Sequence, residues 1–166
     1  TNALLYSVAI EAHKELPVAL ERVRTLRDEE PQMSFYIVPN INNTVMYYHV
    51  MAGPVADSAS AGALLLRLLE KGYKTGAQPG EVRRAQYAFL LGDYENRNDA
   101  DGREREAAEL GIPAYVIEVQ EPDETTARYR VYAGAYSSAT EAGVMKQLLE
   151  NAGLPDELVQ RIGKQR

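Results

Sequence analysis

The chain repeats itself once, and this duplication limits its possible folds more than any other feature of its 166 residues. An offset of 81 residues places YHVMAGPV, residues 48–55, on YRVYAGAY, residues 129–136. Further pairs at this offset are Gly62 and Gly143, Leu68 and Leu149, and Gly72 and Gly153. Self-similarity at a fixed period indicates a repeated structural unit. The sequence therefore predicts two small domains, residues 1–76 and residues 77–166.

Alternating apolar residues bounded by turn residues predict four strands in each copy. The expected strands cover residues 5–10, 34–39, 46–53 and 81–84 in the first copy, and residues 87–91, 114–120, 128–135 and 158–162 in the second. NINNT and EPDETT are the expected connections between the second and third strands. Gly53 and Gly134 end the third strands, where a residue without Cβ lets the chain leave the sheet.

Two helices are expected in each copy. Leu16, Leu20, Val23 and Leu26 recur at helical spacing and predict the first helix of copy one. Its counterpart in residues 97–111 has a weaker pattern and contains a glycine. The second helices have clear ends, and the residues that mark them are the caps Asp57 and Ser138, the capping-box partner Glu141, and the terminal glycines Gly72 and Gly153.

This order of elements defines the expected fold class, which is α+β. Each copy is a βαββαβ unit of the ferredoxin-like kind, with a four-stranded antiparallel sheet and two helices on one face. The other face of each sheet, which we call the open face, carries the alternate strand residues. In copy two, Arg130 and Tyr132 fall on the open face, and in copy one the equivalent residues are His49 and Met51.

Composition argues against a nucleic-acid partner. The net charge is -6 and the pI is about 5.0, whereas a protein that binds phosphate backbones needs a basic surface. An RNA-recognition motif shares the βαββαβ order, but it requires a basic surround and a characteristic aromatic phrase that this chain lacks. The chain also has no cysteine, which excludes disulfides and thiolate chemistry.

The sequence does not favour an enzyme. His13 and His49 are the only histidines, and neither lies in a metal-binding spacing. Composition alone does not exclude a pair of carboxylates for glycoside hydrolysis. Small βαββαβ units, however, offer shallow faces rather than the deep clefts that such chemistry requires. We therefore expect a binding protein without a metal or cofactor.

The repeated pattern resembles a known family. The phrase YxVxAG, a following capped helix with Ala61 or Ala142 on its inner face, and the first-strand phrase FLLGDY at residues 89–94 are similar to the SPOR domain, the sporulation-related repeat. The resemblance implies a bacterial, non-catalytic module of the periplasm or cell envelope. It implies binding to septal peptidoglycan, particularly to glycan strands stripped of their stem peptides. It also allows cell-division or envelope proteins as partners, with membrane attachment only through a segment outside this chain.

Two departures from the family pattern bear on the site. Many SPOR domains carry a glutamine on the open face of the first strand, and the equivalent residues here are Ala9 and Leu90. Copy two keeps Gly92 and Asp93 of the first-strand phrase, so it is the expected binding copy. An aromatic ring beside a hydrogen-bonding cation suits a sugar. The glycan-binding candidates are Arg130, Tyr132, Asp93, Leu90, Tyr115 and His49.

A protein-interaction or structural module is the alternative. Duplicated small domains often bury part of a sheet face against each other. A change from glycan binding to protein interaction would explain why both copies lack the glutamine. Binding to purified peptidoglycan distinguishes the two possibilities.

Overall fold

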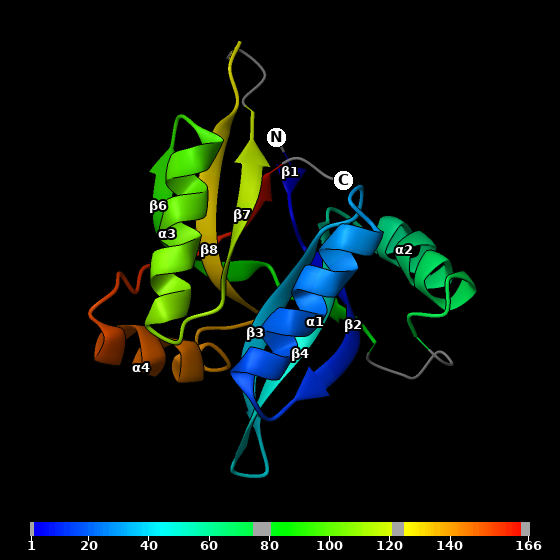
Figure 1. Ribbon diagram of the computed structural model, residues 1–166, viewed down its shortest axis with the longest axis horizontal. Helices are drawn as coiled ribbons and strands as arrows, with labels where there is room; N and C mark the ends of the chain where they lie inside the picture. Colours follow the sequence, from blue (N-terminus) through cyan, green and yellow to red (C-terminus); the bar gives the residue numbers. More distant parts are fainter. Residues whose placement is uncertain (1, 75–80, 121–124, 164–166) are drawn as a thin grey trace.

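The first repeat forms one antiparallel sheet with its helices on one side. The computed structural model of the protein describes residues 2–74, 81–120 and 125–163 (Figure 1). The elements of this repeat are β2 (Tyr6–His13), α1 (Leu16–Glu29), β3 (Phe35–Asn42), β4 (Val45–Val55), α2 (Ser58–Glu70) and β5 (Val82–Arg84). The strand order is β3-β4-β2-β5. The prediction of a βαββαβ unit is confirmed here.

The second repeat has the same topology. Its elements are β6 (Tyr87–Tyr94), α3 (Arg97–Glu109), β7 (Ala114–Val119), β8 (Arg128–Tyr136), α4 (Gly143–Ala152) and β9 (Leu158–Gln160). The strand order is β7-β8-β6-β9, and all neighbouring strands are antiparallel. Two four-stranded antiparallel sheets with helices were predicted, and this α+β fold is confirmed.

The fourth strand of the first sheet lies later in the chain than residue 76. Strand β5 pairs with β2, with Tyr6 opposite Arg84 and Val8 opposite Val82. Strand pairing therefore divides the repeats near Ala85, although the expected division was at residue 76. Two segments lie outside the described residues. They are residues 75–80, before β5, and residues 121–124 of the expected EPDETT loop.

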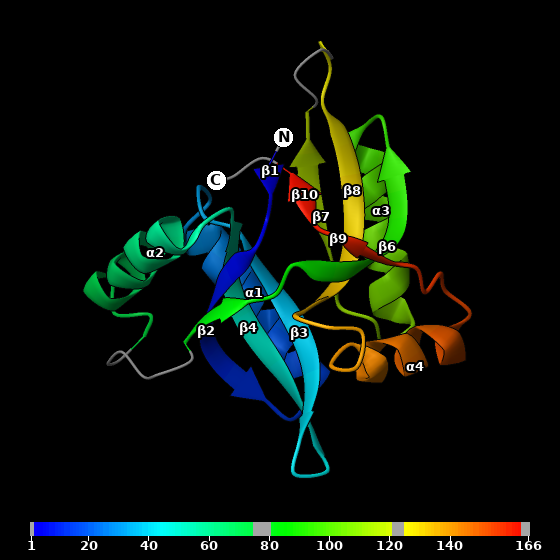
Figure 2. The same cartoon turned by 180° about the vertical axis from the view of Figure 1, so that it is seen from behind.

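An additional pair of short strands links the two ends of the chain. Strand β1 (Asn2–Ala3) pairs with β10 (Ile162–Gly163), and the pair lies between the two sheets (Figure 2). The strand expected at residues 158–162 is therefore divided at Arg161 into β9 and β10, which belong to different sheets. This link between the first and second repeats was not predicted.

The local signals at the second helices act mostly as expected. The Asp57 carboxylate accepts a hydrogen bond from the Ser60 N–H at 2.7 Å and caps α2. The Ser138 hydroxyl likewise accepts from the Glu141 N–H at 3.2 Å. The Glu141 carboxylate, however, accepts from Ser137 rather than Ser138, so the capping box is displaced by one residue. Regular α-helix begins only at Gly143.

The protein has two apolar cores, one within the first repeat and one that includes residues of both repeats. One core lies between the first sheet and its helices α1 and α2. The other core fills the second repeat and continues across the boundary between the repeats. It takes in five residues from the first repeat: Leu4, Ala9, Tyr36, Val38 and Met51. The two open faces therefore pack against each other over part of their area.

Candidate functional site

The open faces meet through two equivalent tyrosines. Tyr36 on β3 and Tyr115 on β7 occupy matching positions in the two copies, and their ring centroids lie 4.4 Å apart. Both side chains are buried. Tyr132 has no exposed surface, and Met51 is 2% exposed. The expectation that Tyr132 and Met51 lie on an accessible face is wrong, because each repeat covers part of the open face of the other.

A buried arginine completes this interface. Arg161, between β9 and β10, is fully buried. Its guanidinium donates to the hydroxyls of Tyr36 at 2.9 Å and Tyr115 at 3.4 Å, and to the Ala85 carbonyl at 2.6 Å. The guanidinium also lies 5.4 Å from the centroid of the Tyr36 ring. Among the described residues no carboxylate pairs with it. Phenol and carbonyl oxygens accept from its two terminal nitrogens, whereas its buried Nε has no hydrogen-bond partner there.

The tyrosine hydroxyls have further partners that fix their orientation. The Tyr115 hydroxyl donates to the Gly134 carbonyl at 2.6 Å, and the Tyr36 hydroxyl contacts the Ser7 hydroxyl. Burial raises the pKa of Tyr115, so this phenol stays protonated and remains a donor. Sequence reasoning missed Arg161 as an interface residue. Its only signal was a charged residue inside the apolar stretch expected to be a strand.

Tyr132 is held by the last strand. Its hydroxyl accepts from the Ile162 N–H at 3.2 Å and lies 3.3 Å from the Ile162 carbonyl. The Arg130 guanidinium also donates to this hydroxyl at 3.3 Å. Strand β10 therefore covers the part of the open face that a sugar ring would need to reach in order to stack on Tyr132.

Part of the open face of the second sheet remains accessible. The Arg128 guanidinium donates to the Asp93 carboxylate at 2.9 Å, and Arg130 lies 3.5 Å from the same carboxylate. The side chains of Arg128, Arg130 and Asp93 are 38%, 24% and 33% exposed. Leu90 lies further along β6, opposite Tyr132, and is partly buried. We call Leu90, Asp93, Arg128 and Arg130 the open strip.

His49 lies apart from the other candidates, on β4 of the first sheet. Its ring centroid is 6.5 Å from that of Tyr47. Burial lowers the pKa of His49, and the positive charge of Arg83 lowers it further, so the ring is neutral near pH 7. The six candidates thus separate into three sets. Tyr115 and Tyr132 are in the interface, Asp93, Leu90 and Arg130 share the open strip, and His49 is on the other sheet.

Residues 84–160 match the family model of the SPOR domain. This segment is the second repeat from the end of β5 to the end of β9, and it contains the open strip. The SPOR domain is a peptidoglycan-binding module of cell-envelope proteins.

The comparison with curated proteins finds no match to the chain. Among the residues that the structure describes, none of the helices is both long and apolar enough to cross a membrane.

Proposed function

We propose that this protein binds peptidoglycan in the periplasm or cell envelope, through the open strip of its second repeat. The observation that carries the proposal is the position of the strip. It lies inside the segment that matches the SPOR domain, and its charged side chains remain accessible although Tyr115 and Tyr132 are covered. The proposed contacts are therefore made by Arg130, Asp93 and Leu90, with Arg128 as an additional donor.

The hydrogen-bond donors of the open strip suit a sugar chain. The Arg130 guanidinium has five N–H donors, so its contacts with Asp93 and Tyr132 leave donors for sugar hydroxyls and acetamido carbonyls. The charges of Arg128 and Arg130 are offset by those of Asp93 and Glu95, which lies 3.5 Å from Arg128. Glycan strands stripped of their stem peptides are the proposed ligand.

Co-sedimentation with purified sacculi tests the proposal. The intact protein should sediment with sacculi, and more of it should do so after an amidase has removed the stem peptides. Arg130→Ala should weaken sedimentation about tenfold, because hydrogen bonds from a charged donor contribute about 1.5–3 kcal/mol each. Arg24→Ala is the matched control, since this arginine lies on α1 and its side chain is 70% exposed. Equal losses in the two variants would contradict the proposed site.

An interaction or structural module is the second candidate function. The observation that favours it is the burial of Tyr36, Tyr115 and Tyr132 between the repeats, which removes the aromatic rings from the surface. Under this alternative the intact protein does not sediment with either kind of sacculi above an unrelated control protein. That result would replace the peptidoglycan proposal.

A further inference from the structure

Strands β1 and β10 form a short clasp between the two repeats. They pair through two residues each, with Asn2 opposite Gly163 and Ala3 opposite Ile162. They make a sheet of their own and extend neither of the four-stranded sheets. We call β1 and β10 the clasp. Figure 2 shows β10 in front of β7 and beside β8, which places it on the open face of the second sheet.

The clasp covers Tyr132, an aromatic ring next to the open strip. The Ile162 N–H donates to the Tyr132 hydroxyl at 3.2 Å, and this side chain has no exposed surface. Tyr132 lies opposite Leu90 in the strand register, and its hydroxyl accepts from Arg130 at 3.3 Å. Leu90 and Arg130 both belong to the open strip. Without β10 above it, the ring would extend the strip by an apolar platform beside these two residues.

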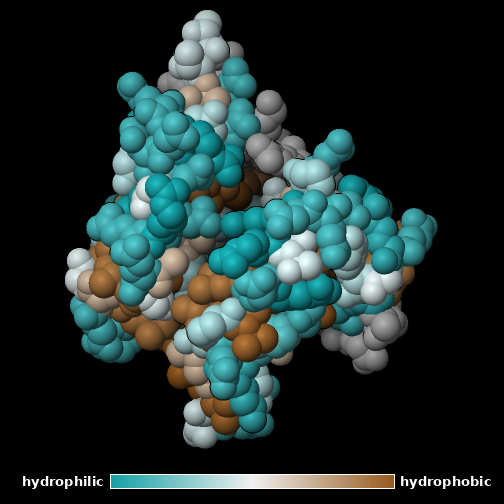
Figure 3. Space-filling model, in the orientation of Figure 1, coloured by the Kyte–Doolittle hydropathy of each residue, from teal (hydrophilic) through white to brown (hydrophobic). Residues whose placement is uncertain are grey.

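A sugar ring can reach Tyr132 only from the side that the clasp occupies. The other face of the second sheet is packed against α3, and Figure 3 shows that the outer surface of this helix is hydrophilic. On the open face, the Tyr115 ring lies beside Tyr132, with 6.1 Å between the ring centroids, and Tyr36 of the first repeat covers Tyr115. Displacing β10 is therefore a smaller change than separating the repeats.

The clasp is held by a short ladder. An isolated pair of strands is marginally stable even when it is longer than two residues. Gly163 packs closely against the Ile117 side chain, and a Cβ on Gly163 would clash with it. Arg161, directly before β10, is bound separately by the tyrosines of the interface, so it can stay in place when β10 moves. The match to the SPOR domain ends at residue 160, and the clasp is thus an addition to the matched segment.

We propose that the clasp is an autoinhibitory contact, and that a glycan strand binds fully only when β10 moves off Tyr132. In the closed form, the glycan contacts the open strip alone. In the open form, a sugar ring also stacks on Tyr132, with its C–H groups on the ring and its hydroxyls near the Arg130 donors. The stacked sugar binds only the open form, so it shifts the population toward that form. This inference rests on the proposed function, because it concerns the same site.

A removable disulfide across the clasp tests the inference. The protein has no cysteine, so Ala3→Cys combined with Ile162→Cys allows a single intramolecular pair. The Leu4 N–H donates to the Arg161 carbonyl at 2.9 Å, which makes Ala3 and Ile162 a non-hydrogen-bonded pair of the ladder. The Cα atoms of such a pair lie about 4.5 Å apart, within the range of about 4.4–6.8 Å that disulfides span.

Co-sedimentation with amidase-treated sacculi is measured on this double variant, once oxidised and once reduced. The oxidised form should bind about fivefold more weakly, because the disulfide keeps Tyr132 covered and removes one stacked ring from the site. Equal binding of the two forms would overturn the inference and leave the proposed function intact. If neither form sediments, the proposed function fails, and the inference fails with it.

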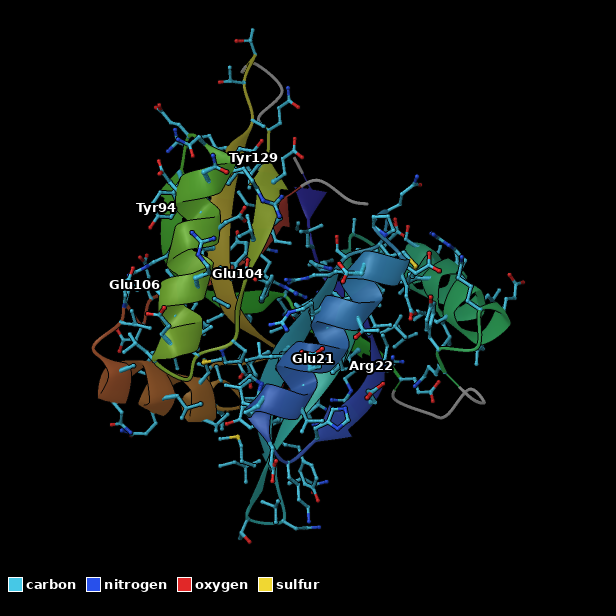
Figure 4. All side chains as sticks on the ribbon, in the orientation of Figure 1. Glu21, Arg22, Tyr94, Glu104, Glu106 and Tyr129 are labelled. Atoms are coloured by element: carbon cyan, nitrogen blue, oxygen red, sulfur yellow. The ribbon has the colours of Figure 1, made fainter. Side chains whose placement is uncertain are left out.

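A substitution at Gly163 gives the opposite perturbation. Gly163→Val cannot pack against Ile117, so the clasp should stay open and sedimentation should increase several-fold. Adding Tyr132→Ala should cancel this increase. Tyr129→Ala is the matched control and should preserve it, because Tyr129 lies on the other face of β8, beside the start of α3 (Figure 4). An increase that persists without the Tyr132 ring would overturn the inference.

Hydrogen exchange in the parent protein tests the opening without a ligand. The Ile162 N–H should exchange much faster than the amides of β8, a central strand of the second sheet, because the clasp opens locally. Protection of the Ile162 N–H equal to that of β8 would show that the clasp opens only with the whole fold. That result would overturn the inference.

Discussion

Removing a single hydroxyl group, that of Tyr136, tests whether the two repeats stabilise each other. Tyr136 on β8 is fully buried, and its hydroxyl donates to the Pro39 carbonyl of β3 at 2.7 Å. The two residues belong to different repeats and are 97 positions apart in the chain. Tyr136→Phe keeps the ring in place and removes only this hydrogen bond. Since Pro39 is also buried, its carbonyl is then left without a partner or water.

The expected loss follows from that unsatisfied carbonyl. Leaving a buried acceptor unpaired costs about 1–3 kcal/mol, and no large cavity forms to add to this. For a chain of this size, each kcal/mol lowers the melting temperature by about 2–4 °C. Tyr136→Phe should therefore lower the free energy of unfolding by about 2 kcal/mol and the melting temperature by about 4–8 °C.

Urea unfolding and thermal melts measure this loss. The midpoint should fall while the m-value stays the same, because the native state still buries the same surface. Tyr47→Phe is the control, since Tyr47 is only partly buried and its hydroxyl makes no hydrogen bond to other described residues. If Tyr136→Phe unfolds within about 0.5 kcal/mol of Tyr47→Phe, the reasoning about this interface is wrong.

Three further predictions concern local features. Gly134→Ala should cost more than about 1 kcal/mol in urea unfolding, because φ is +75° at this residue and a Cβ would meet the Tyr136 ring; a variant as stable as the parent would contradict this. Ser138→Ala should cost about 1 kcal/mol through the lost bond to the Glu141 N–H, and an unchanged urea midpoint would contradict that role. Burial, with a smaller effect from Arg83, lowers the folded-state pKa of His49, so the unfolded chain binds the proton first as the pH falls. Relative to His49→Gln, the parent should therefore lose stability from about pH 6.5 downward until the folded-state pKa is passed; a stability difference independent of pH would contradict the burial of this ring.

Most of the fold could be predicted from signals between residues that are close together in the sequence. The alternating strands, the helical spacing of Leu16 to Leu26 and the cap at Asp57 are local signals, and each lies where the structure has the corresponding element. The Ser138 signal is offset, because α4 begins only at Gly143. The duplication then predicted the same order of strands and helices in the second repeat. Even the short strand β5 was expected, because its counterpart β9 occupies the matching place in the second repeat.

The candidate site was predicted less well, because a side chain's position on a strand does not say what covers it. Alternation correctly placed Arg130 and Tyr132 on the same face of β8, yet Arg130 is accessible and Tyr132 is buried. The difference comes from β10, whose Ile162 backbone binds the Tyr132 hydroxyl. Nothing in the local sequence around Tyr132 contains that information.

The sequence by itself determined two βαββαβ units, the cap of α2, and which residues share each strand face. Periodicity and capping depend on residues a few positions apart, so they can be read along the chain. Only the tertiary structure decided that the two open faces meet, with Tyr36 against Tyr115 and Arg161 between the repeats. Such packing depends on the combined shape of surfaces distant in sequence. It decides which candidate residues a ligand can reach.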